Sequence, residues 1–108
     1  GFKQNGACLV FYFTGQLDAY SEKQFMEYVV NVLKTSASPA VLDLSKIDFL
    51  DSSGLGALVQ LAKQCTDQKR SFNIVGNPRV AQTIKLVRLE DFLHLAPDLS
   101  TAIDQLAA

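Results

Sequence analysis

A strand-like run passes directly into an amphipathic helix at residues 49–56, and this junction constrains the fold of the chain most. Residues 41–44 and 49–50 before the helix have the apolar character of a strand. Apolar residues then recur with the spacing i, i+3, i+4 and i+7, which places one face of a helix against a sheet. A strand that leads into a packed helix is the unit of an α/β fold. The apolar helix positions are Leu55, Leu58, Val59, Ala62 and Cys65.

The start of the chain predicts a β-hairpin. Asn5-Gly6 is typical of a type I′ turn, which needs a positive φ at both central residues. Residues 2–4 are therefore expected to form a short strand that pairs with residues 7–13. The second strand is apolar on both alternating faces, so it should lie inside the sheet, with the first strand as an antiparallel edge.

A turn and a helix are predicted next. Residues 14–18 contain glycine and polar residues and are expected to form the turn. Ser21 and Gln24 have the spacing of a capping box, so a helix should begin near Ser21. Residues 35–39 are small and polar and end in proline, which is typical of a connector. The apolar face of the helix carries Phe25, Met26, Val29, Val32 and Leu33.

Strands and helices continue to alternate in the second half of the chain. A strand is expected from about Ala40, and another over residues 71–75. Asn77 is suited to cap a helix that has Pro78 at its first position and runs over about residues 80–87.

The end of the chain predicts one more short strand and a last helix. Residues 92–95 are apolar around His94, and Asp98 or Ser100 can cap a helix that reaches Leu106. Repeated strand and helix units require crossovers, which make a sheet mostly parallel. The chain is therefore expected to be a single α/β domain over residues 1–108, with a mixed, mostly parallel sheet and about four helices.

Composition excludes several classes of function. The formal net charge is −1, so neither nucleic acid nor an anionic membrane surface is an expected partner. Cys8 and Cys65 lie in apolar stretches and are expected to act as small hydrophobic residues in a cytoplasmic protein. One histidine and two separate cysteines offer no metal-ligand spacing, and no cofactor is expected. The longest apolar run, residues 7–13, is too short to span a bilayer.

The serines of the junction have two possible roles. A helix start has backbone N–H groups without intrahelical partners and a partial positive charge, so a serine there can cap the helix or carry an anion. For Ser52 and Ser53 taken alone, capping is the commoner role. Gly54 and Gly56 form only a lone Gly-x-Gly pattern, and close packing of helix on sheet is expected to explain both.

Four segments in the same order resemble the STAS domain family, and most of all the free-standing bacterial anti-sigma-factor antagonists: residues 15–18, 41–44, 49–56 and 74–80. The resemblance implies that Ser52 is phosphorylated by a partner that is both an anti-sigma factor and a serine kinase. It implies that the unphosphorylated chain binds this partner and frees the sigma factor. A serine phosphatase of the 2C type would remove the phosphate.

The resemblance also implies which residues meet the partner and that the chain has no catalysis of its own. Asp18 could simply form an Asx-turn, but it and Asp51 are also candidates to orient the Ser52 hydroxyl. The oligomeric state is expected to be a monomer or a weak dimer. The predicted contact residues are Asp18, Asp51, Ser52, Ser53, Gly54 and Leu55.

Two alternatives remain open. A STAS module of another stress-signalling assembly or of a lipid-transport complex would leave Ser52 unmodified. A hydrolase using Ser52 and His94 is disfavoured, because the sequence lacks a Gly-x-Ser-x-Gly elbow.

The sequence departs from the family in two places. Gln16 stands where many relatives have glutamate, and Arg88 stands where relatives often have glycine after the third helix. A left-handed backbone at Arg88 would be unfavourable by about 1 kcal/mol.

Overall fold

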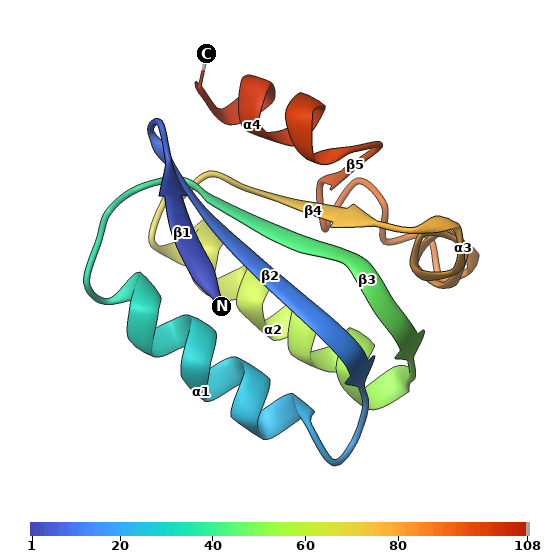
Figure 1. The fold of residues 1–108 in the computed structure, drawn as a ribbon. Coiled ribbons are helices and arrows are strands. Elements are labelled where there is room, and N and C mark those ends of the chain that lie inside the picture. Colours follow the sequence, from blue (N-terminus) through green and yellow to red (C-terminus); the bar gives the residue numbers. More distant parts are fainter. Residues whose placement is uncertain (108) are drawn as a thin grey trace.

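The computed structural model describes residues 1–107. Its elements are β1 (Phe2–Asn5), β2 (Cys8–Leu17), α1 (Glu22–Leu33), β3 (Ala40–Leu50), α2 (Ser52–Asp67), β4 (Phe72–Gly76), α3 (Pro78–Leu86), β5 (Leu95–Ala96) and α4 (Leu99–Ala107). The strands form one sheet in the order β1-β2-β3-β4-β5 (Figure 1). This confirms the predicted α/β alternation.

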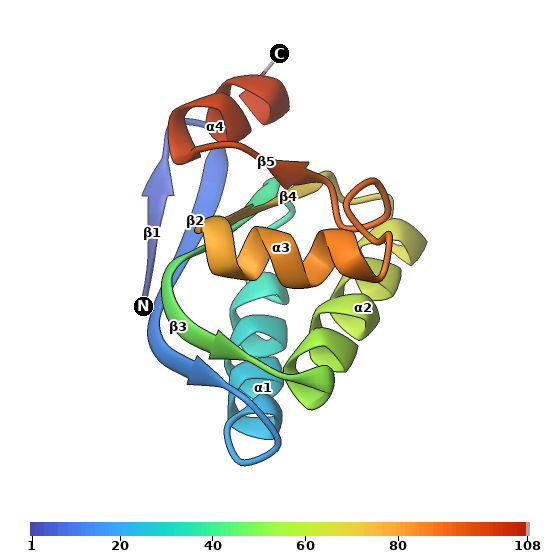
Figure 2. The ribbon, with the colours of Figure 1, turned by 90° about the vertical axis from the view of Figure 1, so that its right-hand side faces the viewer.

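The sheet is mixed in the way the sequence predicts. β1 is antiparallel to β2, whereas the pairs β2 with β3, β3 with β4 and β4 with β5 are parallel. Helices α1 and α2 lie side by side on one face of the sheet, and α4 lies on the other (Figures 1 and 2). Two apolar layers result. The larger holds Phe11, Leu42 and Leu58, and the smaller lies between the sheet and α4, with Val41 from β3 and Ala102 from α4.

The hairpin turn lies one residue later than predicted. Asn5 pairs with Cys8, so the loop residues are Gly6 and Ala7. Of these two, only Gly6 has a positive φ, of 59°. The predicted type I′ turn centred on Asn5-Gly6 is therefore wrong. Glycine takes this φ without a Cβ penalty, and the shift leaves Asn5 free to pair in the sheet.

Strand β2 continues through residues that the sequence analysis assigned to a turn. Thr14 pairs with Lys46 and Leu17 with Leu50, with register shifts on either side of Gly15. Gly15 has a φ of 90°, so the glycine marks an irregularity within the strand. Because β3 is eleven residues long, it supplies pairing partners for this extension. The predicted turn is therefore limited to the residues that follow Leu17.

Helix α1 begins where predicted, but without a capping box. Ser21 is its N-cap residue, yet its side chain makes no capping hydrogen bond. The Ser21 hydroxyl donates to the Gln16 carbonyl at 2.9 Å and accepts from the Asp18 N–H at 3.0 Å. Ser21 therefore stabilises the preceding turn rather than the helix end.

The last third of the chain confirms both later caps. Asn77 accepts from the Val80 N–H at 2.8 Å, and Asp98 accepts from the Thr101 N–H at 2.7 Å. The Thr101 hydrogen bond also lowers the pKa of the Asp98 carboxyl. The predicted strand at residues 92–95 is shorter in the structure, because β5 contains only Leu95–Ala96. His94 lies in the preceding turn with a φ of 53°.

The chain keeps a left-handed residue after α3 even though arginine occupies the position. Arg88 has a φ of 58°, and the N–H of Leu89 donates to the Ile84 carbonyl at 3.1 Å. Arg88→Gly is therefore expected to raise the free energy of unfolding by about 1 kcal/mol, because glycine adopts this φ without steric cost. Urea denaturation measures the change. Arg88→Ala is the control, since it removes the charge but keeps the strain; equal stability of both variants would contradict the explanation.

Candidate functional site at the first turn of α2

Strands β2 and β3 end side by side and bring two loops together. Leu17 pairs with Leu50, and the Asp51 N–H donates to the Leu17 carbonyl at 3.4 Å. Asp18 and Asp51 therefore leave the sheet at the same edge. Figures 1 and 2 both show the β2–α1 loop beside the first turn of α2.

Asp51, and neither serine, caps α2. Its backbone is extended, with φ −104° and ψ −173°, and its carboxylate accepts from the Gly54 N–H at 2.9 Å. A carboxylate at this position also interacts favourably with the positive end of the helix dipole. The capping role that the motif taken alone favours for Ser52 and Ser53 is therefore wrong. Ser52 is instead the first residue of the helix.

The capping role of Asp51 leaves the Ser52 hydroxyl uncommitted. Ser52 is exposed, whereas Ser53 and Leu55 are half-buried. Within residues 1–107, the Ser52 hydroxyl makes no hydrogen bond. The side chain is therefore accessible to a partner enzyme and would give up no internal contact on modification.

Gly54 lets α2 contact the end of β2. A Cβ atom on Gly54 would lie 2.2 Å from the Leu17 carbonyl oxygen, which is far inside van der Waals contact. A Cβ atom on Gly56 would have no neighbour within 4 Å. Close packing thus explains Gly54 as predicted, but the same expectation for Gly56 is wrong. The contact holds the first turn of α2 against the strand end that leads to Asp18.

Asp18 forms an Asx-turn, which is one of the roles that the sequence leaves open for it. Its Oδ1 atom accepts from the N–H groups of Tyr20 at 3.0 Å and Ser21 at 3.1 Å. Asp18 and Asp51 thus each use Oδ1 to hold local backbone, and within residues 1–107 each Oδ2 makes no hydrogen bond. A role for either aspartate in orienting the Ser52 hydroxyl remains a prediction.

His94 does not lie with Ser52. Its ring packs on Phe72, with centroids 4.7 Å apart, and Phe72 pairs with Ala40 at the first residue of β3. Ser52 lies two residues beyond Leu50, the last residue of the same strand, so the two side chains lie at opposite ends of the sheet. The structure therefore brings no histidine base to Ser52, and the predicted contacts of a hydrolase are not formed.

The cysteines do not form a reactive centre either. Cys8 and Cys65 are both buried and unpaired, as predicted for small hydrophobic residues. Burial raises the pKa of both thiols, and the charge of Arg70 opposes this only in part for Cys65. Among residues 1–107, no three His, Cys, Asp or Glu side chains are placed to hold a metal ion. None of the helices described has both the length and the apolar character needed to cross a membrane.

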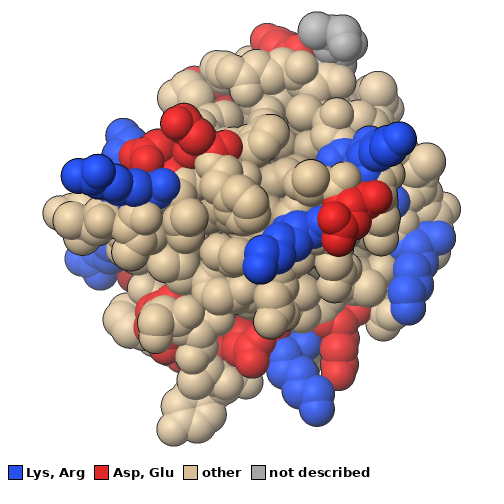
Figure 3. Space-filling view, turned by 180° about the vertical axis from the view of Figure 1, so that it is seen from behind, with Lys and Arg blue, Asp and Glu red and all other residues tan. Residues whose placement is uncertain are grey.

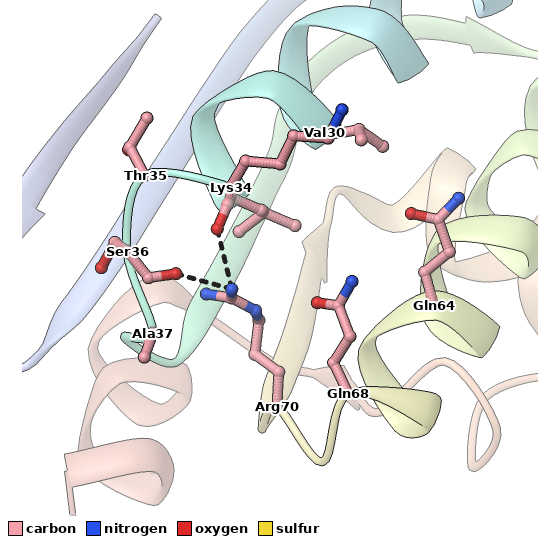
Figure 4. A pocket seen from close by; sticks show the side chains of 9 residues that line it. Val30, Lys34, Thr35, Ser36, Ala37, Gln64, Gln68 and Arg70 are labelled. Atoms are coloured by element: carbon pink, nitrogen blue, oxygen red, sulfur yellow. Dashed lines mark hydrogen bonds between the residues drawn. The ribbon is translucent and has the colours of Figure 1, made fainter.

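A cavity lies away from Ser52, between the C-terminal ends of α1 and α2 (Figure 4). It has a volume of about 610 Å³. Arg70 donates to the carbonyls of Leu33 at 2.8 Å, Ser36 at 2.6 Å and Ser38 at 2.7 Å. These bonds tie the α1–β3 connection to the start of β4, so we assign Arg70 a structural role.

Charges of both signs are interspersed on the face shown in Figure 3, and no large patch of one sign covers it. This arrangement agrees with the formal net charge of −1. A positive track that could follow a nucleic-acid backbone is absent from that face.

Residues 2–102 match the family model of the STAS domain. This chain belongs to the STAS domain family. The STAS domain described here is 24% identical over 82 residues to the anti-sigma-B factor antagonist of Staphylococcus epidermidis, covering 75% of this chain and 76% of the relative. The resemblance inferred from the four sequence segments is confirmed.

Solved structures share the fold. An anti-sigma factor antagonist from Mycobacterium paratuberculosis superposes with a TM-score of 0.89 at 23% identity, covering 99% of this STAS domain and 92% of that chain. The murine anion transporter Slc26a9 superposes with a TM-score of 0.82 at 17% identity, covering 97% of this chain but only 18% of the transporter. The fold is thus shared by proteins of different function, so the function must be argued from the site.

Proposed function

We propose that this STAS domain is an anti-sigma-factor antagonist whose binding is controlled by phosphorylation of Ser52. The observation that carries the proposal is the exposed Ser52 hydroxyl. It is not needed to cap α2, because Asp51 does so. The names of the curated relatives support the same class of function.

The proposed partner is an anti-sigma factor that is also a serine kinase. The unphosphorylated domain binds this partner in the cytoplasm and so releases the sigma factor. A phosphatase of the 2C type removes the phosphate and restores binding. The proposed contact surface surrounds the first turn of α2 and consists of Asp18, Asp51, Ser52, Ser53 and Leu55; Gly54, which the sequence analysis also named, is buried beneath it.

In the proposed phosphoryl transfer, this chain is the substrate of the kinase. The γ-phosphoryl group of ATP passes to Ser52 Oγ, ADP leaves, and the hydroxyl proton goes to a base that the kinase supplies. The domain contributes an accessible nucleophile on a rigid helix start. The positive end of the α2 dipole favours the added phosphate, so the fold tolerates the modification that the partner surface does not.

Intact-mass measurement tests the site of modification. Incubation with the cognate kinase and ATP is expected to add one phosphoryl group to the wild-type domain and to Ser53→Ala, but none to Ser52→Ala. Ser53→Ala is the matched control because it removes a neighbouring hydroxyl from the same helix turn. A phosphoryl group on Ser52→Ala would rule out Ser52 as the site.

A second function fits the same fold. In that alternative, the domain is an interaction module of another signalling assembly or of a lipid-transport complex, and Ser52 stays unmodified. Because the same fold also occurs within the Slc26a9 transporter, the fold alone does not discriminate between the two functions. Adjacent genes discriminate the two: a serine kinase and a phosphatase favour the phosphorylation switch, whereas transporter subunits favour the alternative.

A further inference from the structure

Tyr20 is almost entirely exposed in the turn between β2 and α1. Its exposed fraction is 97%, against 76% for Leu86 and 50% or less for the other large apolar side chains that reach the surface. The position was not selected from the sequence, because an aromatic residue in a short polar turn has no periodic signal. A tyrosine this exposed packs against nothing that would explain it as part of the fold.

The backbone that carries Tyr20 is held in place although its side chain is free. The Tyr20 N–H donates to Asp18 Oδ1 at 3.0 Å, and the Glu22 N–H donates to the Asp18 carbonyl at 2.9 Å. The Ser21 hydroxyl adds a bond to the Gln16 carbonyl at 2.9 Å. The Asx-turn therefore presents the ring from a fixed point, which lowers the entropy lost when a partner contacts it.

Tyr20 and Ser52 fit within the footprint of one partner. A path runs along the backbone from Tyr20 to Leu17, across the hydrogen bond of 3.4 Å from the Asp51 N–H to the Leu17 carbonyl, and on to Ser52. The length of this path is an upper limit of about 22 Å on the distance between the Tyr20 and Ser52 Cα atoms. A standard interface buries about 800 Å² on each partner, which corresponds to a disc roughly 30 Å across. A kinase that docks over Ser52 therefore has room to contact Tyr20 as well.

We propose that Tyr20 is the anchor residue by which the kinase recognises this domain before it phosphorylates Ser52. This inference rests on the proposed function and adds a specificity-determining residue to it. Tyrosine is enriched among the residues that dominate interfaces, because it supplies a large contact area at the loss of few rotatable bonds. The partner is expected to carry an apolar pocket that takes the ring.

Steady-state phosphorylation kinetics with the cognate kinase and ATP test the anchor. Tyr20→Ala is expected to raise the KM for the domain by about 30-fold and to leave kcat unchanged, because an anchor contributes to docking and not to phosphoryl transfer. Tyr20→Phe keeps the ring and is expected to retain most of the affinity. The melting temperature of Tyr20→Ala should equal that of the wild type, since the side chain is 97% exposed.

Leu86→Ala is the matched control. Leu86 is 76% exposed and is the last residue of α3. The start of that helix is the end nearer the site, because Arg79 donates to the Asp48 carbonyl there. Removal of the Leu86 side chain is expected to leave KM unchanged. An unchanged KM in Tyr20→Ala, or a loss confined to kcat, would overturn the anchor while leaving phosphorylation of Ser52 intact. A wild-type domain that the kinase does not phosphorylate would overturn both proposals.

Discussion

Gly54→Ala is expected to lower the free energy of unfolding by about 3 kcal/mol, at the upper end of the usual cost of overpacking. The added Cβ atom would lie 2.2 Å from the Leu17 carbonyl oxygen and 2.8 Å from its carbonyl carbon. Both neighbours belong to the backbone of a paired strand, so neither can rotate away. The helix and the strand must move apart instead. Urea denaturation measures the loss.

Gly56→Ala is the control for this experiment. It makes the same chemical change two residues further along the helix, where a Cβ atom would have no neighbour within 4 Å. Alanine is a better helix former than glycine, so this variant is expected to be more stable than the wild type by about 0.5–1 kcal/mol. Similar stabilities for the two alanine variants would contradict the close contact at Gly54.

The architecture could be predicted because it depends on patterns that repeat over whole elements. The apolar spacing at Phe25, Val29 and Leu33 defines one helix face, and these three residues are buried as expected. The strand and helix alternation then requires parallel neighbours joined by crossovers. An error of one or two residues in the predicted end of a helix or strand does not change such a pattern.

The extension of β2 could not be predicted because it depends on a distant strand. Gly15 and the polar residues around it have the composition of a turn, and only pairing with β3 makes them a strand. The hairpin shift at Asn5 has the same origin, since the extra pair with Cys8 is decided by register and not by the turn residues alone. Tertiary pairing overrides local preference in both places.

The site could be located from the sequence, but its capping residue could not. Asp51, Ser52 and Ser53 all have side chains that can cap a helix, so local chemistry does not choose among them. The choice is made by the hydrogen bond from the Asp51 N–H to the Leu17 carbonyl, which keeps Asp51 extended at the strand end. The helix then begins at Ser52, and its hydroxyl is left exposed.

Ser52→Asp is expected to weaken binding of the domain to its anti-sigma factor by at least about 100-fold. The surface that accepts a neutral hydroxyl must then bury a charge beside Asp51, and an unpaired buried charge costs several kcal/mol. Since about 1.4 kcal/mol corresponds to a tenfold change, no change of shape is needed to reach this factor. Titration calorimetry with the purified anti-sigma factor measures the affinity.

Ser52→Asn separates charge from size in the same experiment. Asparagine has nearly the shape of aspartate without its charge, so this variant is expected to keep most of the affinity that Ser52→Asp loses. Both variants should fold normally because Ser52 is exposed, and the negative charge that Ser52→Asp adds at the first turn of α2 interacts favourably with the helix dipole. Equal loss of binding in both variants would show that bulk blocks docking, and a charge-controlled switch at Ser52 would have to be abandoned.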